Sequence, residues 1–236
     1  MSDSLVWENI FSNKEWGKYP SETLIRFIAR NFYNVKDRNK IKILELGLGT
    51  GANLWFCARE GFRVSGIEWS QTGVQRFKDR LENENLTHRI DEIKIGDYEQ
   101  KLDEFEDESF DAVIDVASLC CNDFKKSQIV FKKAMRKLKV GGKFFSLTLA
   151  VGLEGFDESK GLEQTLQNGI YAHEGILRFS TLEKLEELYN NKHFKRTDLT
   201  IITRESDGKI IDKIYVIEGL KLHSCKVTGG GQGISI

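Results

Sequence analysis

The stretch Ile41-Lys-Ile-Leu-Glu-Leu-Gly-Leu-Gly-Thr-Gly-Ala-Asn53 decides the fold of this chain. A short apolar run leads through the carboxylate of Glu45 into a loop with glycine at every second position, Gly47, Gly49 and Gly51. Without a β-carbon, these residues let the backbone turn sharply and let a ligand lie against main-chain N–H groups. A parallel strand presents a nucleoside to the start of a helix in this way. The stretch therefore predicts a nucleoside-type cofactor at this turn.

The glycine pattern alone also fits the dinucleotide fingerprint of NAD and FAD proteins, since Ala52 follows at the right spacing. A second predicted strand, residues 63–67, ends at Glu68, where a carboxylate can accept two hydrogen bonds from a ribose diol. Dinucleotide cofactors and cofactors with a single nucleoside both use such an acid. A third predicted strand, residues 90–95, ends just before Asp97, beside the same crevice. This third acid favours an adenosine without a pyrophosphate.

Taken in order, the acid and glycine loop, Glu68, Asp97 and two later segments resemble the class I S-adenosylmethionine-dependent methyltransferases. The later segments are Phe110-Asp-Ala-Val-Ile-Asp115 and Leu138-Lys-Val-Gly-Gly-Lys143. The resemblance runs from about residue 41 to 149, and more loosely to 220. It implies an α/β, Rossmann-like fold with a mostly parallel seven-stranded sheet and helices on both faces. It also implies S-adenosylmethionine as cofactor, S-adenosylhomocysteine as its product, and no metal.

The order of the predicted elements supports this fold. The predicted strands alternate with helices at 52–60, 71–84 and 123–138. Such alternation implies a parallel sheet with right-handed crossovers. The carboxyl-terminal part departs from it, because two β-rich runs, 199–204 and 209–218, are joined by Asp207-Gly208, a tight-hairpin signal. A reversed last strand belongs to the resembled fold and not to a dehydrogenase half-domain.

The composition indicates an ordinary soluble globule. Among 236 residues, 35 Lys and Arg oppose 36 Asp and Glu, a formal charge of −1. No bulk field therefore draws the chain to nucleic acid or to a membrane, and we expect neither as a partner. No apolar run approaches the roughly 20 residues of a membrane span, and no targeting segment is visible, so the cytoplasm is the expected location. The cysteines lack C-x-x-C spacing and are interpreted as reduced thiols; they are Cys57, Cys120, Cys121 and Cys225. The oligomeric state is left open.

Three regions are predicted along the chain. Residues 1–40 form an amino-terminal helical cover, in which Ser21 caps the second helix. Residues 41–220 form the methyltransferase domain that binds S-adenosylmethionine, with a lid inserted at about 150–180, because a connection of that length is usually functional or disordered. Residues 221–236 form a glycine-rich tail that is predicted to be mobile.

The resemblance assigns the cofactor contacts. They are Glu45, Gly47, Gly49, Gly51, Asn53, Glu68, Trp69, Asp97, Tyr98 and Asp115. Glu45 would orient the ammonium of the cofactor, Glu68 would bind the ribose, and Asp97 would take the adenine amino group. Asp97 can also start a helix as its N-cap. Trp69 can lie flat on the adenine or pack in the core.

The acceptor side is less determined. The segment Asp115-Val-Ala-Ser-Leu-Cys-Cys-Asn-Asp123 lacks the Asn/Asp-Pro-Pro-Tyr/Phe signature of enzymes that methylate planar amino nitrogens such as adenine N6. Asp115 and His173 are the catalytic candidates, since a neutral imidazole in the lid can take a proton from a hydroxyl. A surface histidine is the alternative interpretation of His173. The predicted acceptor contacts are Trp16, Tyr19, Asn122, Tyr171, His173 and Arg178, of which Trp16 and Tyr19 can equally anchor the cover.

These observations predict an enzyme that moves a methyl group from S-adenosylmethionine to an oxygen or nitrogen of a small-molecule acceptor. Sugar or surface-glycan precursors, natural-product intermediates and small amines all fit. Because a sulfonium methyl is already electrophilic, the enzyme mainly has to align it with the acceptor and exclude water. The alternatives are a protein or RNA methyltransferase, a non-catalytic S-adenosylmethionine-binding module and a nicotinamide oxidoreductase.

Overall fold

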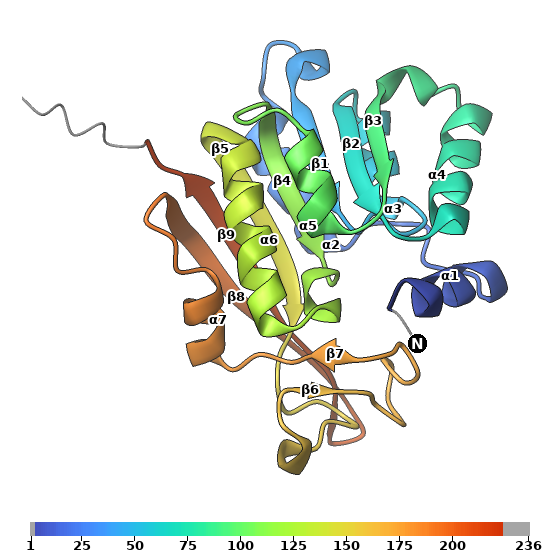
Figure 1. The fold of residues 1–236 in the computed structure, drawn as a ribbon, viewed down its shortest axis with the longest axis vertical. Helices are drawn as coiled ribbons and strands as arrows, with labels where there is room; N and C mark the ends of the chain where they lie inside the picture. Colours follow the sequence, from blue (N-terminus) through green and yellow to red (C-terminus); the bar gives the residue numbers. More distant parts are fainter. Residues whose placement is uncertain (1–2, 224–236) are drawn as a thin grey trace, which may run out of the picture.

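Seven strands form one twisted sheet in the order β3-β2-β1-β4-β5-β9-β8 in the computed structural model, which describes residues 3–223 and the side chains of 5–223 (Figure 1). The strands are β1 Lys42–Leu46, β2 Arg63–Glu68, β3 Ile90–Ile95, β4 Phe110–Val116, β5 Leu138–Leu149, β8 Phe194–Ser206 and β9 Lys209–Lys221. The pairs among β1 to β5 are parallel, and β9 runs antiparallel to both β5 and β8. The predicted fold class is confirmed.

Helices cover both faces of this sheet. They are α2 Glu22–Phe32, α3 Ala52–Arg59, α4 Gln71–Asn83, α5 Tyr98–Lys101, α6 Phe124–Lys137 and α7 Leu182–Leu188. Neighbouring residues of a strand point to opposite faces, so Ile43 packs with α2, α3 and α4 while Leu44 packs with α5, α6 and α7. The strands are therefore buried on both sides, which is why they read as continuous apolar runs.

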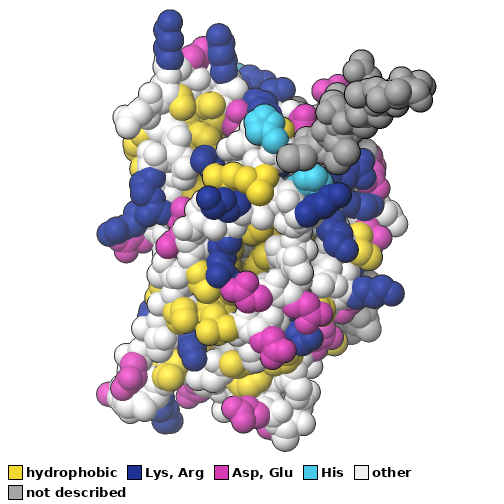
Figure 2. Space-filling view, turned by 90° about the vertical axis from the view of Figure 1, so that its left-hand side faces the viewer, with side chains coloured by type: hydrophobic (Ala, Val, Ile, Leu, Met, Phe, Trp, Pro, Cys, Tyr) yellow, Lys and Arg dark blue, Asp and Glu magenta, His cyan; other side chains and the backbone are white. Residues whose placement is uncertain are grey.

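The carboxyl-terminal hairpin forms where the sequence predicts it. Asp207 and Gly208 both have positive φ, 50° and 75°, as a two-residue hairpin turn requires. Both strands are longer than the predicted runs, because the ladder between β8 and β9 continues from Ser206 back to Phe194. The sequence predicts a buried strand over residues 143–149, and β5 begins earlier, at Leu138, directly after α6. Figure 2 shows the face that carries this hairpin, where acidic and basic side chains are interspersed.

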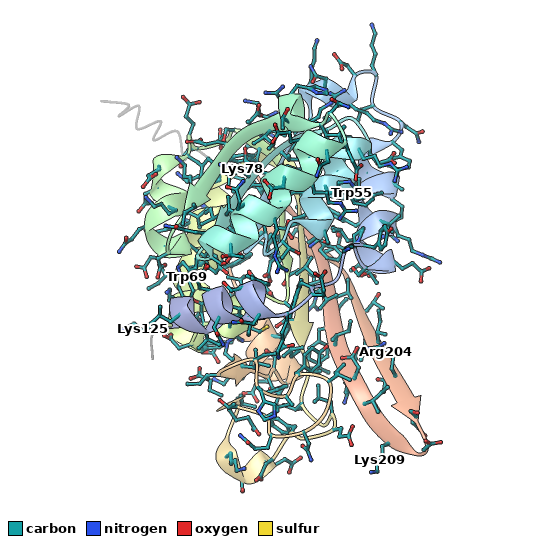
Figure 3. The ribbon with its side chains drawn as sticks, turned by 90° about the vertical axis from the view of Figure 1, so that its right-hand side faces the viewer. Trp55, Trp69, Lys78, Lys125, Arg204 and Lys209 are labelled. Carbon is teal, nitrogen blue, oxygen red and sulfur yellow. The ribbon has the colours of Figure 1, made fainter. Side chains whose placement is uncertain are left out.

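Two further segments lie beyond the carboxyl ends of the parallel strands. Helix α1, Asp3–Asn13, is attached to the start of α4, because the Glu8 carboxylate accepts hydrogen bonds from the Ser70 hydroxyl, at 2.5 Å, and from the Thr72 hydroxyl. The segment 150–180 contains a small sheet of β6, Glu163–Gln164, and β7, Leu177–Arg178. Figure 3 shows α1 between α4 and this segment.

The two covering segments contact each other. A β-carbon on Gly175 would lie 3.3 Å from the Val6 side chain, so the lid and α1 meet above the sheet edge. No helix within residues 3–223 is long and apolar enough to span a membrane. Lys221 still belongs to β9, and the rest of the predicted tail from residue 224, with Cys225, lies outside the described residues. The division into cover, domain and tail stays a prediction.

Candidate active site

The glycine loop between β1 and α3 is held against the end of β2. The N–H groups of Gly47 and Leu48 both donate to the Ile67 carbonyl, at 2.9 and 3.2 Å. Gly51 has φ 82°, and a β-carbon there would lie 2.1 Å from the Phe77 ring. Gly51 is therefore required for packing the loop onto α4, whereas Gly47 and Gly49 face a cavity. The structure places only part of the predicted glycine set at the cavity surface.

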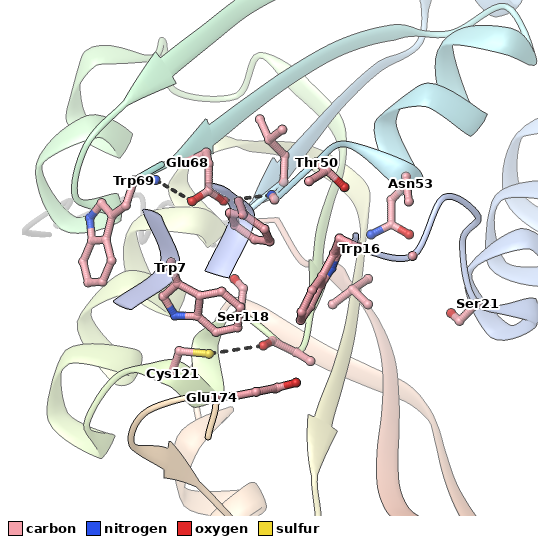
Figure 4. A pocket seen from close by; sticks show the side chains of 18 of the residues that line it. Trp7, Trp16, Ser21, Thr50, Asn53, Glu68, Trp69, Ser118, Cys121 and Glu174 are labelled. Atoms are coloured by element: carbon pink, nitrogen blue, oxygen red, sulfur yellow. Dashed lines mark hydrogen bonds between the residues drawn. The ribbon is translucent and has the colours of Figure 1, made fainter. Parts of the chain in front are cut away.

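The cavity has a volume of about 260 Å³ and lies at the carboxyl edge of the sheet (Figure 4). Its walls come from α1 and the linker after it, the glycine loop, the ends of β2 and β4, and the lid. Of the predicted contact residues, it is lined by Trp16, Tyr19, Gly47, Gly49, Asn53, Glu68, Trp69, Tyr98 and Tyr171. Tyr19 lines it from the rim, where 74% of its side chain is exposed.

Glu68 occupies the cavity wall with its carboxylate fixed by main-chain donors. It accepts hydrogen bonds from the N–H groups of Gly49 and Trp69, both at 2.8 Å, and of Ser70, at 2.9 Å. Burial raises its pKa, and these three N–H groups counteract that rise. A carboxylate has about four acceptor positions, so one remains for a ligand.

Glu45 lies below the glycine loop, fully buried and behind the cavity wall. One carboxylate oxygen accepts a hydrogen bond from the Asn53 amide at 2.5 Å, and the other is buried with no hydrogen-bond partner in the described part of the chain. Burial, with the nearby charges of Asp115 and Glu68, raises the pKa of Glu45 to about 8. A buried acceptor without a donor is costly, which marks this position as one that a cationic ligand group would stabilise. The site thus fits an ammonium near the loop.

Trp69 and Tyr98 form one aromatic wall of the cavity. Their rings are nearly parallel, with centroids 5.8 Å apart and an interplanar angle of 8°. The Lys126 ammonium lies 4.8 Å from the centre of the Trp69 ring and forms an ion pair with Asp97 at 2.5 Å. Asp97 also caps α5 by accepting from the Glu99 N–H at 2.8 Å. The alternative role of Asp97 as a helix cap is therefore present, and its side chain does not line the cavity.

Asp115 is fully buried at the end of β4 and does not reach the cavity surface. Its carboxylate accepts from the N–H groups of Ser118 and Leu119, at 3.1 and 2.9 Å, and from the Ser146 hydroxyl at 2.6 Å. These bonds hold the β4 loop, in which Ala117 takes a φ of 55°. Asp115 thus shapes the cavity through Ser118, which lines it. Asn122 is also buried behind this loop, where its amide donates to the Ser118 carbonyl at 3.3 Å.

Tyr171 and Glu174 of the predicted lid line the cavity. The two other residues predicted there, His173 and Arg178, do not line it. His173 is exposed, with a φ of 66°, and does not line the cavity, so the structure does not place it as a general base. Arg178 is 2% exposed and donates to the carbonyls of Leu119 and Asn122, so its guanidinium holds the β4 loop and does not face an acceptor.

Sequence reasoning missed the aromatic roof of the cavity. Trp7 and Phe11 of α1 line it together with Trp16, and the three ring centroids are 5.4 to 5.8 Å apart. Trp7 and Phe11 are four residues apart and therefore share one face of a helix. That spacing was the available signal. It does not reveal whether the face packs on protein or on a ligand.

The cysteines near the site are free thiols. Cys57 and Cys120 are buried, and Cys121 lines the cavity with its thiol donating to the Ala117 carbonyl at 3.5 Å. The neighbouring Cys120 thiol, and after it burial, raise the pKa of Cys121 well above its ordinary value. Within residues 3–223, no three His, Cys, Asp or Glu side chains gather as metal ligands.

Comparisons with known proteins agree with this geometry. Residues 44–146 match a family described as a methyltransferase domain. Demethylmenaquinone methyltransferase of Tropheryma whipplei (strain Twist) is 34% identical over 103 residues, which are 43% of this chain and 39% of that protein. The chain thus matches well under half the length of this curated relative.

Solved structures share the fold over most of the chain. An S-adenosylmethionine-dependent methyltransferase from Methanosarcina mazei has a TM-score of 0.67 at 19% identity, covering 87% of this chain and all of that chain, 100%. Phosphoethanolamine N-methyltransferase 2 of Haemonchus contortus, in complex with S-adenosyl-L-methionine, has a TM-score of 0.63 at 18% identity, covering 94% of this chain and 58% of that one. At such identities the likeness concerns the fold, while the match over residues 44–146 concerns the sequence. Residues 44–146 therefore match the sequence of a methyltransferase domain, and the chain shares the fold of S-adenosylmethionine-dependent methyltransferases.

Proposed function

We propose that this protein transfers the methyl group of S-adenosylmethionine to an oxygen or nitrogen atom of a small-molecule acceptor. The observation that carries the proposal is the buried Glu45 carboxylate below the glycine loop, whose second oxygen has no hydrogen-bond partner among residues 5–223. A cofactor that brings an ammonium to this loop would compensate the buried charge. A nicotinamide dinucleotide brings a pyrophosphate instead, which the same charge would repel.

The residues of this chain would hold the cofactor in three places. Asn53 would face its amino-acid end with the Glu45 carboxylate directly behind it, Glu68 would face its ribose, and the paired rings of Trp69 and Tyr98 would face its base. When bound, S-adenosylmethionine supplies a methyl group activated by its sulfonium. The protein then has to align the acceptor with that methyl group and keep water away.

The covering segments support a small acceptor. Trp7 and Phe11 approach the cavity from α1, Tyr171 approaches from the lid, and the two segments meet at Gly175. A protein or RNA acceptor would need an open cleft at this edge. The name of the Tropheryma relative also gives it a small-molecule acceptor, demethylmenaquinone.

Calorimetry with S-adenosylhomocysteine and NAD tests the proposal. We expect S-adenosylhomocysteine to bind and NAD not to bind. Glu68→Gln should weaken S-adenosylhomocysteine binding roughly 10- to 100-fold, since a hydrogen bond to a charged group contributes about 1.5–3 kcal/mol. The exposed Glu82→Gln serves as the matched control and should leave affinity unchanged. Binding of NAD in place of S-adenosylhomocysteine would overturn the proposal.

A further inference from the structure

The charged side chains that line the cavity are all acidic. In the described part of the chain these are Glu68 and Glu174, and no Lys, Arg or His lines the cavity. Phosphates and carboxylates are normally held by Arg or Lys. An anionic acceptor would therefore find no cationic side chain in the cavity wall, whereas a cationic acceptor would be attracted by two carboxylates.

Glu174 is the acid in the cavity that has no proposed contact with the cofactor. Glu68 is engaged by three N–H groups, but Glu174 makes no hydrogen bond or ion pair with any residue in the range 5–223. The charge of Lys14 acts on Glu174 only from beyond ion-pair distance. Burial raises the pKa of Glu174, so this carboxylate is suited to accept a proton. Figure 4 shows its side chain at the cavity, below the rings of Trp7 and Trp16.

The roof opposite Glu174 is aromatic. Trp7 and Trp16 meet edge to face, with an interplanar angle of 87° and centroids 5.8 Å apart, and Phe11 completes the cluster. Perpendicular rings present faces in different directions to one space. An ammonium near a Trp face is attracted by the ring quadrupole, and an apolar body packs on the same rings.

We propose that the acceptor is a primary or secondary amine on a small apolar body, bound as its ammonium between Glu174 and the rings of Trp7 and Trp16. This inference rests on the proposed function. In the reaction, an N–H bond of the ammonium breaks and its proton forms an O–H bond with Glu174. The freed lone pair forms the N–C bond to the methyl carbon, while the C–S bond breaks and its electron pair stays on sulfur. The methylated ammonium and S-adenosylhomocysteine leave, and Glu174 returns its proton to water.

The test compares isosteric probes in the presence of saturating S-adenosylhomocysteine. Phenethylamine, 2-phenylethanol and 3-phenylpropionate are titrated by calorimetry into the wild type, Glu174→Gln and Glu158→Gln, the last being an exposed acid of the same lid. We expect the wild type to bind the amine at least 10-fold more tightly than the alcohol, and the carboxylate not to bind. Glu174→Gln should lose this preference while its S-adenosylhomocysteine affinity stays within 2-fold, and Glu158→Gln should match the wild type.

Other outcomes separate the two proposals. Failure of the wild type to bind S-adenosylhomocysteine would refute the proposed function. Normal S-adenosylhomocysteine binding with no preference for the amine would refute the present inference alone. A loss of S-adenosylhomocysteine affinity in Glu174→Gln would assign the carboxylate to the cofactor and overturn its role toward the acceptor. Glu174→Asp, which keeps the charge, should retain part of the amine preference and guards against an unfolded variant.

Discussion

Replacing Glu45 with glutamine separates the effect of the buried charge on stability from its effect on cofactor binding. The substitution keeps the size of the side chain and leaves an oxygen that can accept the hydrogen bond from Asn53, now 2.5 Å long. It removes the charge of a fully buried carboxylate whose second oxygen has no hydrogen-bond partner within residues 5–223. The protein without cofactor and the protein with cofactor should therefore respond in opposite directions.

The effect on stability follows from the pKa. Burial raises the pKa of Glu45 to about 8 in the folded protein, from an ordinary value of 4.5. Between these values the folded state binds more protons than the unfolded state, so the free energy of unfolding falls as pH rises, by at most about 1.4 kcal/mol per pH unit for this group. Glu45→Gln removes this contribution. After allowing for the unpaired amide, we expect the variant without cofactor to be more stable than the wild type by about 1–3 kcal/mol at pH 8, and by less at pH 5.

The effect on cofactor binding has the opposite sign. If the ammonium of S-adenosylhomocysteine pairs with this carboxylate, its loss should weaken binding roughly 10- to 100-fold, from about 1.5–3 kcal/mol for a charge-assisted hydrogen bond. In the wild type, binding to ionised Glu45 should release a proton below pH 8, so affinity should rise with pH toward that value. Glu45→Gln should lose this rise.

Urea unfolding and calorimetry between pH 5 and 8 measure both effects. Titrations in buffers of different ionisation enthalpy count the released proton. Glu106→Gln, an exposed acid without an ion pair within residues 5–223, is the control and should change neither quantity. A Glu45→Gln variant that is less stable at pH 8 and binds S-adenosylhomocysteine within 2-fold of the wild type would refute the reasoning. Glu45 would then be only a structural acceptor for Asn53.

Three further predictions concern the frame of the site. Gly51→Ala should lower the free energy of unfolding by about 2–5 kcal/mol in urea titrations, because it combines a φ of 82° with a β-carbon 2.1 Å from the Phe77 ring; a loss under 1 kcal/mol, roughly, would show that the loop relaxes. Arg178→Met should cost about 1–3 kcal/mol by the same measurement, since buried carbonyls lose their donor, and an unchanged midpoint would contradict the role of Arg178 in holding the β4 loop. Tyr171→Phe removes a 2.7 Å hydrogen bond to Asp212 and should speed amide hydrogen exchange in residues 169–175, with S-adenosylhomocysteine affinity within 2-fold; unchanged exchange would mean that this bond does not hold the lid.

Much of the sheet could be predicted because its signals are local. Strands buried on both faces are continuous apolar runs, and the turn at Asp207 and Gly208 needs residues that tolerate positive φ. Glu68 could be predicted because it ends a strand, and the carboxyl end of a strand in such a sheet has a defined place. The early start of β5 could not be predicted, since the signal in Lys139 to Gly142 is that of a turn and the pairing with neighbouring strands decides the outcome.

The acceptor side could not be predicted because it depends on side-chain direction in irregular backbone. His173 and Glu174 are neighbours, and the positive φ of His173 leaves the imidazole exposed while Glu174 lines the cavity. Arg178 is predicted as an acceptor contact, yet its guanidinium donates to carbonyls that a distant segment brings to it. Asp97 forms an ion pair with Lys126, which lies 29 positions away in the chain. None of these contacts has a local signature.

The acidic lining of the cavity limits which physical effects can accelerate the proposed reaction. Two cations would enter the site, and one cation and a neutral thioether would leave it. One unit of charge at roughly 6–8 Å, with an effective dielectric constant of about 20, corresponds to about 2–3 kcal/mol, so Glu68 and Glu174 would hold the reactants more firmly than the products. That attraction is already present in the bound reactants and weakens as the sulfonium loses its charge during methyl transfer. By itself it therefore favours substrate binding and product release and does not lower the barrier. The barrier would have to be lowered by alignment and by exclusion of water, which depend on α1 and the lid meeting at Val6 and Gly175.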